Sequence, residues 1–161
     1  MKELHEILLT FFRKQINIII MLFAININAP QAESIKKLPE NHVLISINQE
    51  EPEELFPLKI DRNLPEVLTL RFSDITKPLD YKGQMLYPIN KKQTLQLLEF
   101  IEKYKDKNFI IHCAAGISRS GAVAQFINET YGHSLKPEFW KVSHPNNYVL
   151  YMLRTKGEYK H

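Results

Sequence analysis

Apolar and polar positions along this chain fall into blocks that predict strands and helices in turn. Three short runs, rich in β-branched or aromatic residues and bounded by turn-forming ones, predict buried strands: residues 43–47, 67–72 and 109–112. Residues 91–104 place Leu95, Leu98 and Ile101 at helical spacing instead, which predicts an amphipathic helix that packs on the sheet.

The remaining apolar stretches predict a short helix, a first strand and three further helices, over residues 4–12, 16–25, 32–38, 118–131 and 145–154. Gly132 ends the fourth of these segments, as glycine commonly does at a helix C-terminus. Residues 49–57 are acidic and contain proline, which predicts a solvated loop. Strands that alternate with helices indicate an α/β fold of three layers, in which helices flank a mainly parallel sheet of four or five strands.

The length of 161 residues suits one domain, which we expect over residues 16–161 after an N-terminal extension over residues 1–15. Polar residues at positions 13–15 interrupt the apolar N-terminal segment, so it fits neither a membrane span nor a signal peptide well. A single cysteine rules out an intramolecular disulfide and favours a reducing compartment, which predicts a cytoplasmic protein with a reactive thiol.

The chemistry of the chain is concentrated in residues 112–121, His-Cys-Ala-Ala-Gly-Ile-Ser-Arg-Ser-Gly. The run leaves a predicted strand and enters a predicted helix, whose first amides have no intrahelical partner and attract anions. Gly116 permits a backbone angle that other residues resist, and Arg119 offers a planar fork to two oxygens of a phosphate group. The loop therefore predicts a cradle for a tetrahedral oxyanion.

Cys113 lies in this cradle, where amides and a guanidinium lower the pKa of a thiol. We expect a thiolate that acts as a nucleophile without a separate base. Ser120 can donate a hydrogen bond to the thiolate, whereas Ser118 can cap the following helix. His112 can brace the loop, or it can be a half-buried histidine with no role in chemistry.

His112 and Cys113, five intervening residues, then Arg119 and Ser120 resemble the signature loop of the cysteine-dependent protein tyrosine and dual-specificity phosphatases. The resemblance implies a phosphatase-like fold, a phosphocysteine intermediate on Cys113 and binding of the transferred group by Arg119. By the same resemblance, the phosphate-binding residues would be the six that follow Cys113: Ala114, Ala115, Gly116, Ile117, Ser118 and Arg119. It also implies that no metal or organic cofactor is needed.

The same family places an aspartate general acid on a loop upstream of the cysteine. Asp74 follows the predicted strand 67–72 and precedes Cys113 by 39 residues, and Asp80 precedes it by 33. Asp74 is the first choice because it adjoins the strand end, and Asp80 is the alternative. Asn146 and Asn147 can approach this site, but a cap of the last helix is the simpler interpretation.

The substrate class follows from what the loop lacks. Its five intervening residues carry no charge, whereas the lipid phosphatases of this superfamily tend to carry lysines there. The predicted partner is a phosphorylated protein, on phosphotyrosine or on mixed phosphotyrosine, phosphoserine and phosphothreonine sites. We expect no nucleic acid and no membrane as partner, and the sequence does not indicate an oligomeric state. The alternatives are a catalytically poor module that binds phosphorylated ligands and an RNA 5′-phosphatase with the same loop.

Overall fold

Four parallel strands form the central sheet of the computed structural model, which describes residues 22–49, 57–133 and 144–158. In spatial order the strands are β1 (Ala24–Ile27), β6 (Asn108–His112), β2 (His42–Asn48) and β3 (Val67–Arg71). The helices are α2 (Ala29–Ser34), α3 (Lys91–Lys103), α4 (Arg119–Tyr131) and α5 (Asn147–Arg154). The predicted α/β class with a parallel sheet is confirmed, with four strands in the described part of this sheet.

The position of β2 explains why its sequence is apolar on both faces. It pairs with β6 on one side and with β3 on the other, so that Ser46 lies opposite His112 and also opposite Thr69. Five consecutive residues of β2 are buried. Because all four strands run in the same direction, the loop after β6 and the segment after β3 meet at the same edge of the sheet.

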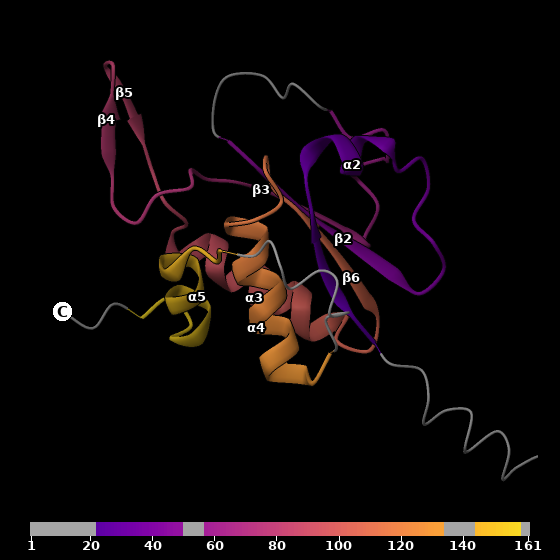
Figure 1. Cartoon of the computed structure of the whole chain (residues 1–161). Helices are drawn as coiled ribbons and strands as arrows, with labels where there is room; N and C mark the ends of the chain where they lie inside the picture. The colour runs from indigo at the N-terminus through magenta and orange to yellow at the C-terminus, as the bar shows by residue number, and fades with distance from the viewer. Residues whose placement is uncertain (1–21, 50–56, 134–143, 159–161) are drawn as a thin grey trace, which may run out of the picture.

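Two layers of apolar side chains cover the sheet. Helices α3, α4 and α5 lie on one face, where the larger core contains Phe72, Phe109 and Ile111 (Figure 1). The short helix α2 lies on the other face, where a smaller core contains Leu44 and Ile110. None of the described helices has both the length and the apolar character that a membrane span requires.

Helix α3 forms where it is predicted, but its buried face is rotated from the predicted one. A capping box between Asn90 and Gln93 starts the helix. Leu97 and Ile101 are fully buried, whereas Leu95 is 46% exposed, so the assignment of Leu95 to the packed face was wrong. Leu97 is in the helical register of Ile101, and its neighbour Leu98 is only partly buried on the edge of the core.

The first elements begin at other residues than predicted. Helix α2 spans Ala29–Ser34 rather than residues 32–38. It starts earlier because Asn28 forms a capping box with Gln31 and Pro30 occupies the first turn, where proline is tolerated. Strand β1 ends at Ile27, two residues later than predicted. The helix predicted over residues 4–12, most of the strand predicted over 16–25 and most of the loop predicted over 49–57 lie outside the described residues.

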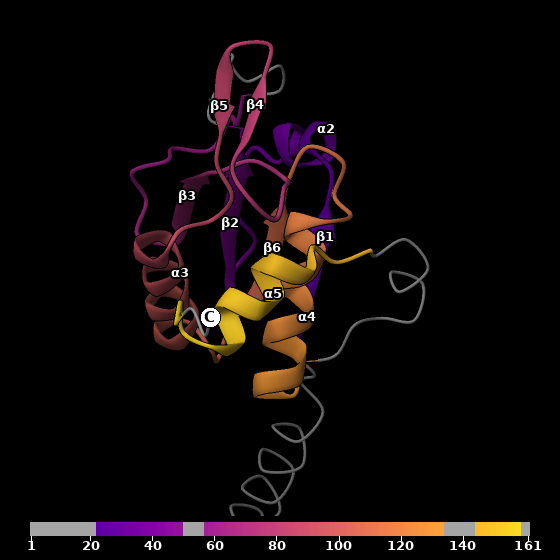
Figure 2. The ribbon, with the colours of Figure 1, turned by 90° about the vertical axis from the view of Figure 1, so that its left-hand side faces the viewer.

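A β-hairpin that the sequence analysis missed follows β3. It consists of β4 (Leu79–Tyr81) and β5 (Gln84–Leu86), paired antiparallel. The hairpin projects from the body of the molecule in both views (Figure 1, Figure 2). Lys82, with φ of +53°, and Gly83, with φ of +83°, form its turn, and positive φ at both central positions is the pattern of a type I′ turn.

Candidate active site

The loop between β6 and α4, residues 113–118, is the candidate anion cradle. Gly116 has φ of +70°, in the region that favours glycine. A Cβ atom there would lie 2.4 Å from the backbone carbon of Ile27 and 2.5 Å from the backbone nitrogen of Asn28. The end of β1 therefore packs directly against the loop backbone, and both the angle and the close approach require glycine.

The carbonyl groups of alternate loop residues are bonded to the structure around the loop. Ala29 N donates to Ala114 O (3.1 Å), Asn26 Nδ2 donates to Gly116 O (2.6 Å), and Asn146 N donates to Ser118 O (3.0 Å). A carbonyl oxygen repels an oxyanion, so these bonds remove three unfavourable groups from the cradle. With these carbonyls bonded outward, amides of the loop are available to bind an anion.

Cys113 is at the base of this loop and only 2% exposed. Its Sγ lies 3.1 Å from Ser120 Oγ. Burial alone would raise the pKa of the Cys113 thiol, but four other effects outweigh it and hold the pKa below the ordinary value. In order of size they are the Ser120 hydroxyl, the Ser120 amide, the positive charge of Arg119 and the Ile117 amide. The arrangement favours a buried thiolate.

Arg119 is also buried, at 2% exposure, although it carries a permanent charge. Its Nη1 donates to Phe72 O at 2.7 Å, which fixes one side of the guanidinium at the end of β3. Its Nε has no hydrogen-bond partner in the described part of the chain. A buried guanidinium with an unused donor, six residues after the thiol in the same loop region, is suited to bind an anionic ligand.

His112 is fully enclosed at 1% exposure, and its Nε2 lies 2.7 Å from Ser46 Oγ on the neighbouring strand β2. Asn48 Nδ2 donates to the same hydroxyl at 3.0 Å. The ring is therefore held by a side chain of the sheet and is not half-buried as one interpretation predicted. It anchors the start of the loop to β2.

The two candidate acids occupy different places. Asp74 Oδ1 accepts hydrogen bonds from Ser118 Oγ and from Asn146 Nδ2, each at 2.8 Å, so it lies against the cradle loop. Asp80 is in the hairpin, where its Oδ1 accepts from Gly83 N at 2.8 Å and shapes the turn. The structure brings Asp74 and the loop together and gives Asp80 a local structural contact.

Sequence reasoning misread or missed several contacts of the loop. Ser118 precedes α4, but its side chain makes no cap hydrogen bond and binds Asp74 instead. Asn146 caps α5 as expected and also reaches Asp74. The contact of Asn26 with the Gly116 carbonyl was missed. The polar residue in the apolar run Ile25–Ile27 was its only signal, because a polar side chain inside a buried strand needs a hydrogen-bond partner.

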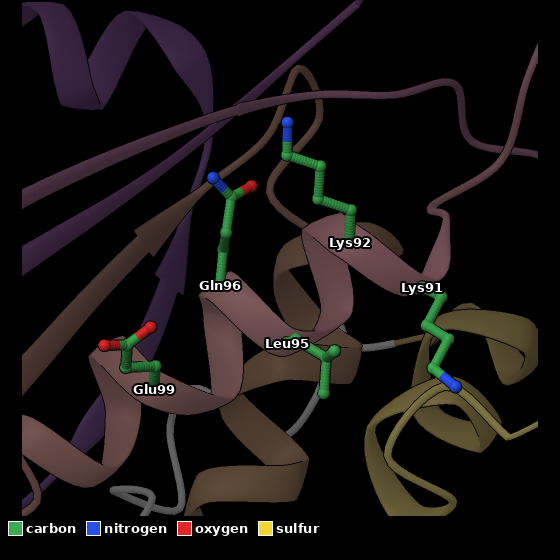
Figure 3. A pocket seen from close by; sticks show the side chains of 5 residues that line it. All are labelled: Lys91, Lys92, Leu95, Gln96 and Glu99. Atoms are coloured by element: carbon green, nitrogen blue, oxygen red, sulfur yellow. The ribbon is translucent and has the colours of Figure 1, made fainter.

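A hollow on the surface of α3 is separate from the cradle (Figure 3). Its lining side chains all come from this one helix: Lys91, Lys92, Leu95, Gln96 and Glu99. None of them contributes to the loop or to the segment that carries Asp74. We therefore assign the chemistry of the chain to the cradle and not to this hollow.

Comparison with known proteins gives similarity in fold only. No protein-family model and no curated protein matches this chain. Among solved structures it is similar to a human tyrosine phosphatase-like serine/threonine/tyrosine-interacting protein, with 21% identity, 71% of this chain and 74% of that chain covered, and a TM-score of 0.40. It is also similar to Tk-PTP in the active form, with 22% identity, 75% and 71% covered, and a TM-score of 0.35.

At this identity and TM-score the matches assign neither an activity nor a substrate to this chain. The functional interpretation depends on the geometry of the loop.

The contact between Ser120 and Cys113 predicts how the thiol titrates. Replacing Ser120 by alanine removes the largest interaction that favours the thiolate, so the pKa of Cys113 should rise. The rate of alkylation by iodoacetamide, followed against pH, measures this directly, because Cys113 is the single cysteine of the chain. The wild-type midpoint should lie below that of a free thiol, and the Ser120→Ala midpoint should move to higher pH.

Ser118→Ala is the matched control, because this hydroxyl belongs to the same loop but is bonded to Asp74. Its alkylation midpoint should stay close to that of the wild type. An unchanged midpoint in Ser120→Ala would show that the cradle does not set the ionisation of Cys113.

Proposed function

We propose that this chain is a cysteine-dependent phosphatase that hydrolyses phosphate monoesters through a phosphocysteine intermediate. The observation that carries the proposal is the enclosure of a thiol of lowered pKa and a buried arginine by one glycine-containing loop. Asp74 is bonded to the same loop. Nucleophile, anion receptor and proton donor are therefore available at one edge of the sheet.

In the first step the Cys113 thiolate attacks phosphorus, and the bond between phosphorus and the ester oxygen breaks. Arg119 and the loop amides bind the oxygens of the transferred group, on which charge is concentrated in the transition state. Asp74 transfers its proton to the departing ester oxygen, which leaves as an alcohol or a phenol. The products of this step are the free leaving group, an Asp74 carboxylate and the phosphocysteine.

In the second step a water molecule attacks phosphorus and gives a proton to the Asp74 carboxylate. The bond between sulfur and phosphorus breaks, and inorganic phosphate is released. The Ser120 hydroxyl, 3.1 Å from Sγ, stabilises the thiolate as it departs. Both steps restore the starting state of Cys113 and Asp74, so the cycle needs no further reactant.

We propose a phosphorylated protein as the substrate. The five residues between Cys113 and Arg119 are uncharged, so they offer no cation for additional phosphate groups. The β4–β5 hairpin supplies a contact surface next to the acid, because Ser73 N donates to Tyr87 O at 2.8 Å and joins the base of the hairpin to the residue before Asp74. Four exposed large apolar side chains lie on it or directly after it: Leu79, Tyr81, Met85 and Tyr87.

The direct test of the activity is hydrolysis of 4-nitrophenyl phosphate in the presence of a chelator, with and without vanadate. The wild type should turn over, and vanadate should inhibit it because it occupies the cradle as an anion of similar shape. Cys113→Ser should abolish turnover, since a hydroxyl of high pKa replaces the thiolate. Circular dichroism should show that this variant keeps its fold.

Turnover in Cys113→Ser at the wild-type rate would refute the nucleophile. A folded wild type without turnover that still binds vanadate would favour a module that binds phosphorylated ligands.

Asp74→Asn should lower kcat much more for esters with a poor leaving group than for esters with a good one, because the variant cannot protonate the leaving group. Phenolate is a poor leaving group, so we expect kcat for phenyl phosphate to fall by about 10²- to 10⁴-fold, the usual range for general acid–base catalysis. The loss for an activated aryl phosphate should be much smaller, because its phenolate departs without a proton.

Asp80→Asn is the control, since Asp80 is bonded within the hairpin turn. It should keep both rates near those of the wild type. The opposite pattern, with the loss in Asp80→Asn, would move the acid to the hairpin.

A further inference from the structure

We propose that Asn146 is a positioning residue for the general acid: it holds Asp74 Oδ1, so that Oδ2 is the oxygen that carries the transferred proton. This role rests on the proposed phosphatase activity. It assigns a function to the N-terminus of α5, which contributes no residue to the cradle itself.

The orientation of the Asn146 amide is fixed by chemistry. Its Oδ1 accepts hydrogen bonds from the backbone amides of Tyr148 and Val149, both at 3.0 Å. Backbone amides only donate, so the oxygen must face the helix and the NH₂ group must face away from it. Nδ2 therefore points at Asp74 as an obligatory donor, and the distance to Oδ1 is 2.8 Å. Asn146 is 8% exposed, which protects this bond from water.

The backbone of the same residue is bonded to the cradle. Asn146 N donates to Ser118 O at 3.0 Å, and Ser118 Oγ donates to the same Oδ1 of Asp74 at 2.8 Å. Asp74, Ser118 and Asn146 thus form a closed triangle of hydrogen bonds between three segments that are far apart in the chain. Val149 and Leu153 are almost fully buried against the main core, so α5 is a firm support for this triangle.

Two donors on one carboxylate oxygen decide where the proton of the acid resides. Oδ1 already accepts from Nδ2 and from the Ser118 hydroxyl, so the proton of the acid form is on Oδ2. In the first step this proton passes from Oδ2 to the ester oxygen as the bond to phosphorus breaks. In the second step Oδ2 receives a proton from the attacking water. Without Asn146, Ser118 alone would orient the carboxyl group, and the proton would be delivered from a wider range of positions.

Asn146→Ser separates this role from the capping of α5. Serine is as good an N-cap as asparagine, so the helix should keep its start, but its short side chain cannot also reach Asp74. Asn90→Ser is the matched control, because Asn90 caps α3 through Gln93 N in the same way and has no contact with Asp74. The midpoint of urea unfolding should be nearly the same in both variants and in the wild type.

The kinetic readout is the ratio of kcat for phenyl phosphate to kcat for 4-nitrophenyl phosphate. We expect Asn146→Ser to lower kcat for phenyl phosphate by about tenfold or more, the scale of a displaced catalytic group, with a smaller loss on the activated ester. Asn90→Ser should keep the wild-type ratio. In an Asp74→Asn background, adding Asn146→Ser should leave kcat for phenyl phosphate almost unchanged, because the acid on which Asn146 acts is already absent.

Two outcomes would overturn the role of Asn146 and leave the proposed activity intact: a wild-type ratio in Asn146→Ser, or an equal loss in the presence and absence of Asp74. Asn146→Ala should lose the cap as well, so its unfolding midpoint should fall while its kinetic ratio matches that of Asn146→Ser. A wild type that hydrolyses neither ester would overturn the proposed function, and the role of Asn146 with it.

Discussion

Cys113 has to be buried and ionised at the same time, and the loop around it meets this requirement. Burial opposes the thiolate, because a charge removed from water loses its solvation. Donors from Ser120 and Ile117 and the charge of Arg119 outweigh that effect. They can do so only if the loop turns its amides toward the sulfur, and the positive φ of Gly116 and the outward bonds of the loop carbonyls produce this conformation.

The sheet fixes the loop from several sides. Asn26 binds the Gly116 carbonyl from β1, and His112 is held by Ser46 on β2. Arg119 donates to the carbonyl of Phe72, which directly follows β3 and lies two residues before Asp74. Each contact joins a different strand, or the residue that directly follows it, to residues 112–119. The parallel sheet therefore helps to determine the shape of the loop, and it places Asp74, the proposed acid, beside the loop.

One oxygen atom of Asp74, the proposed acid, is bonded to this unit. Asp74 is exposed, and the bonds from Ser118 and Asn146 connect it to the cradle and to the N-terminus of α5. The hairpin that begins five residues later leaves the protein surface at the same place, so the proposed chemistry and the proposed contact with a phosphorylated protein share one edge of the sheet.

Features encoded by neighbouring residues could be predicted from the sequence. The strand, loop and helix around Cys113 follow from an apolar run, a glycine and an alanine-rich segment that are contiguous, and Asp74 follows from its position after β3. The sequence indicated that Asn146 can approach the site, but its bond to Asp74 was not predicted. The contacts of Asn26 and Ser46 were not predicted either, because they join residues that are far apart in the chain and depend on strand order.

Other differences have local causes. The buried face of α3 was assigned to Leu95 because the spacing of leucines in this helix fits two faces, and only packing on the sheet selects Leu97. The hairpin was missed because its strands are three residues long and their side chains are mostly exposed, so they show no period that differs from that of a loop.

The central claim is that phosphorus becomes bonded to Cys113 during turnover. The most direct measurement is acid quench of the enzyme with an aryl phosphate, followed by mass spectrometry of the peptide that contains this single cysteine. The account predicts a phosphate adduct on Cys113 that appears with substrate and disappears as substrate is exhausted. Turnover without any adduct on Cys113, or with an adduct on another residue, would contradict it.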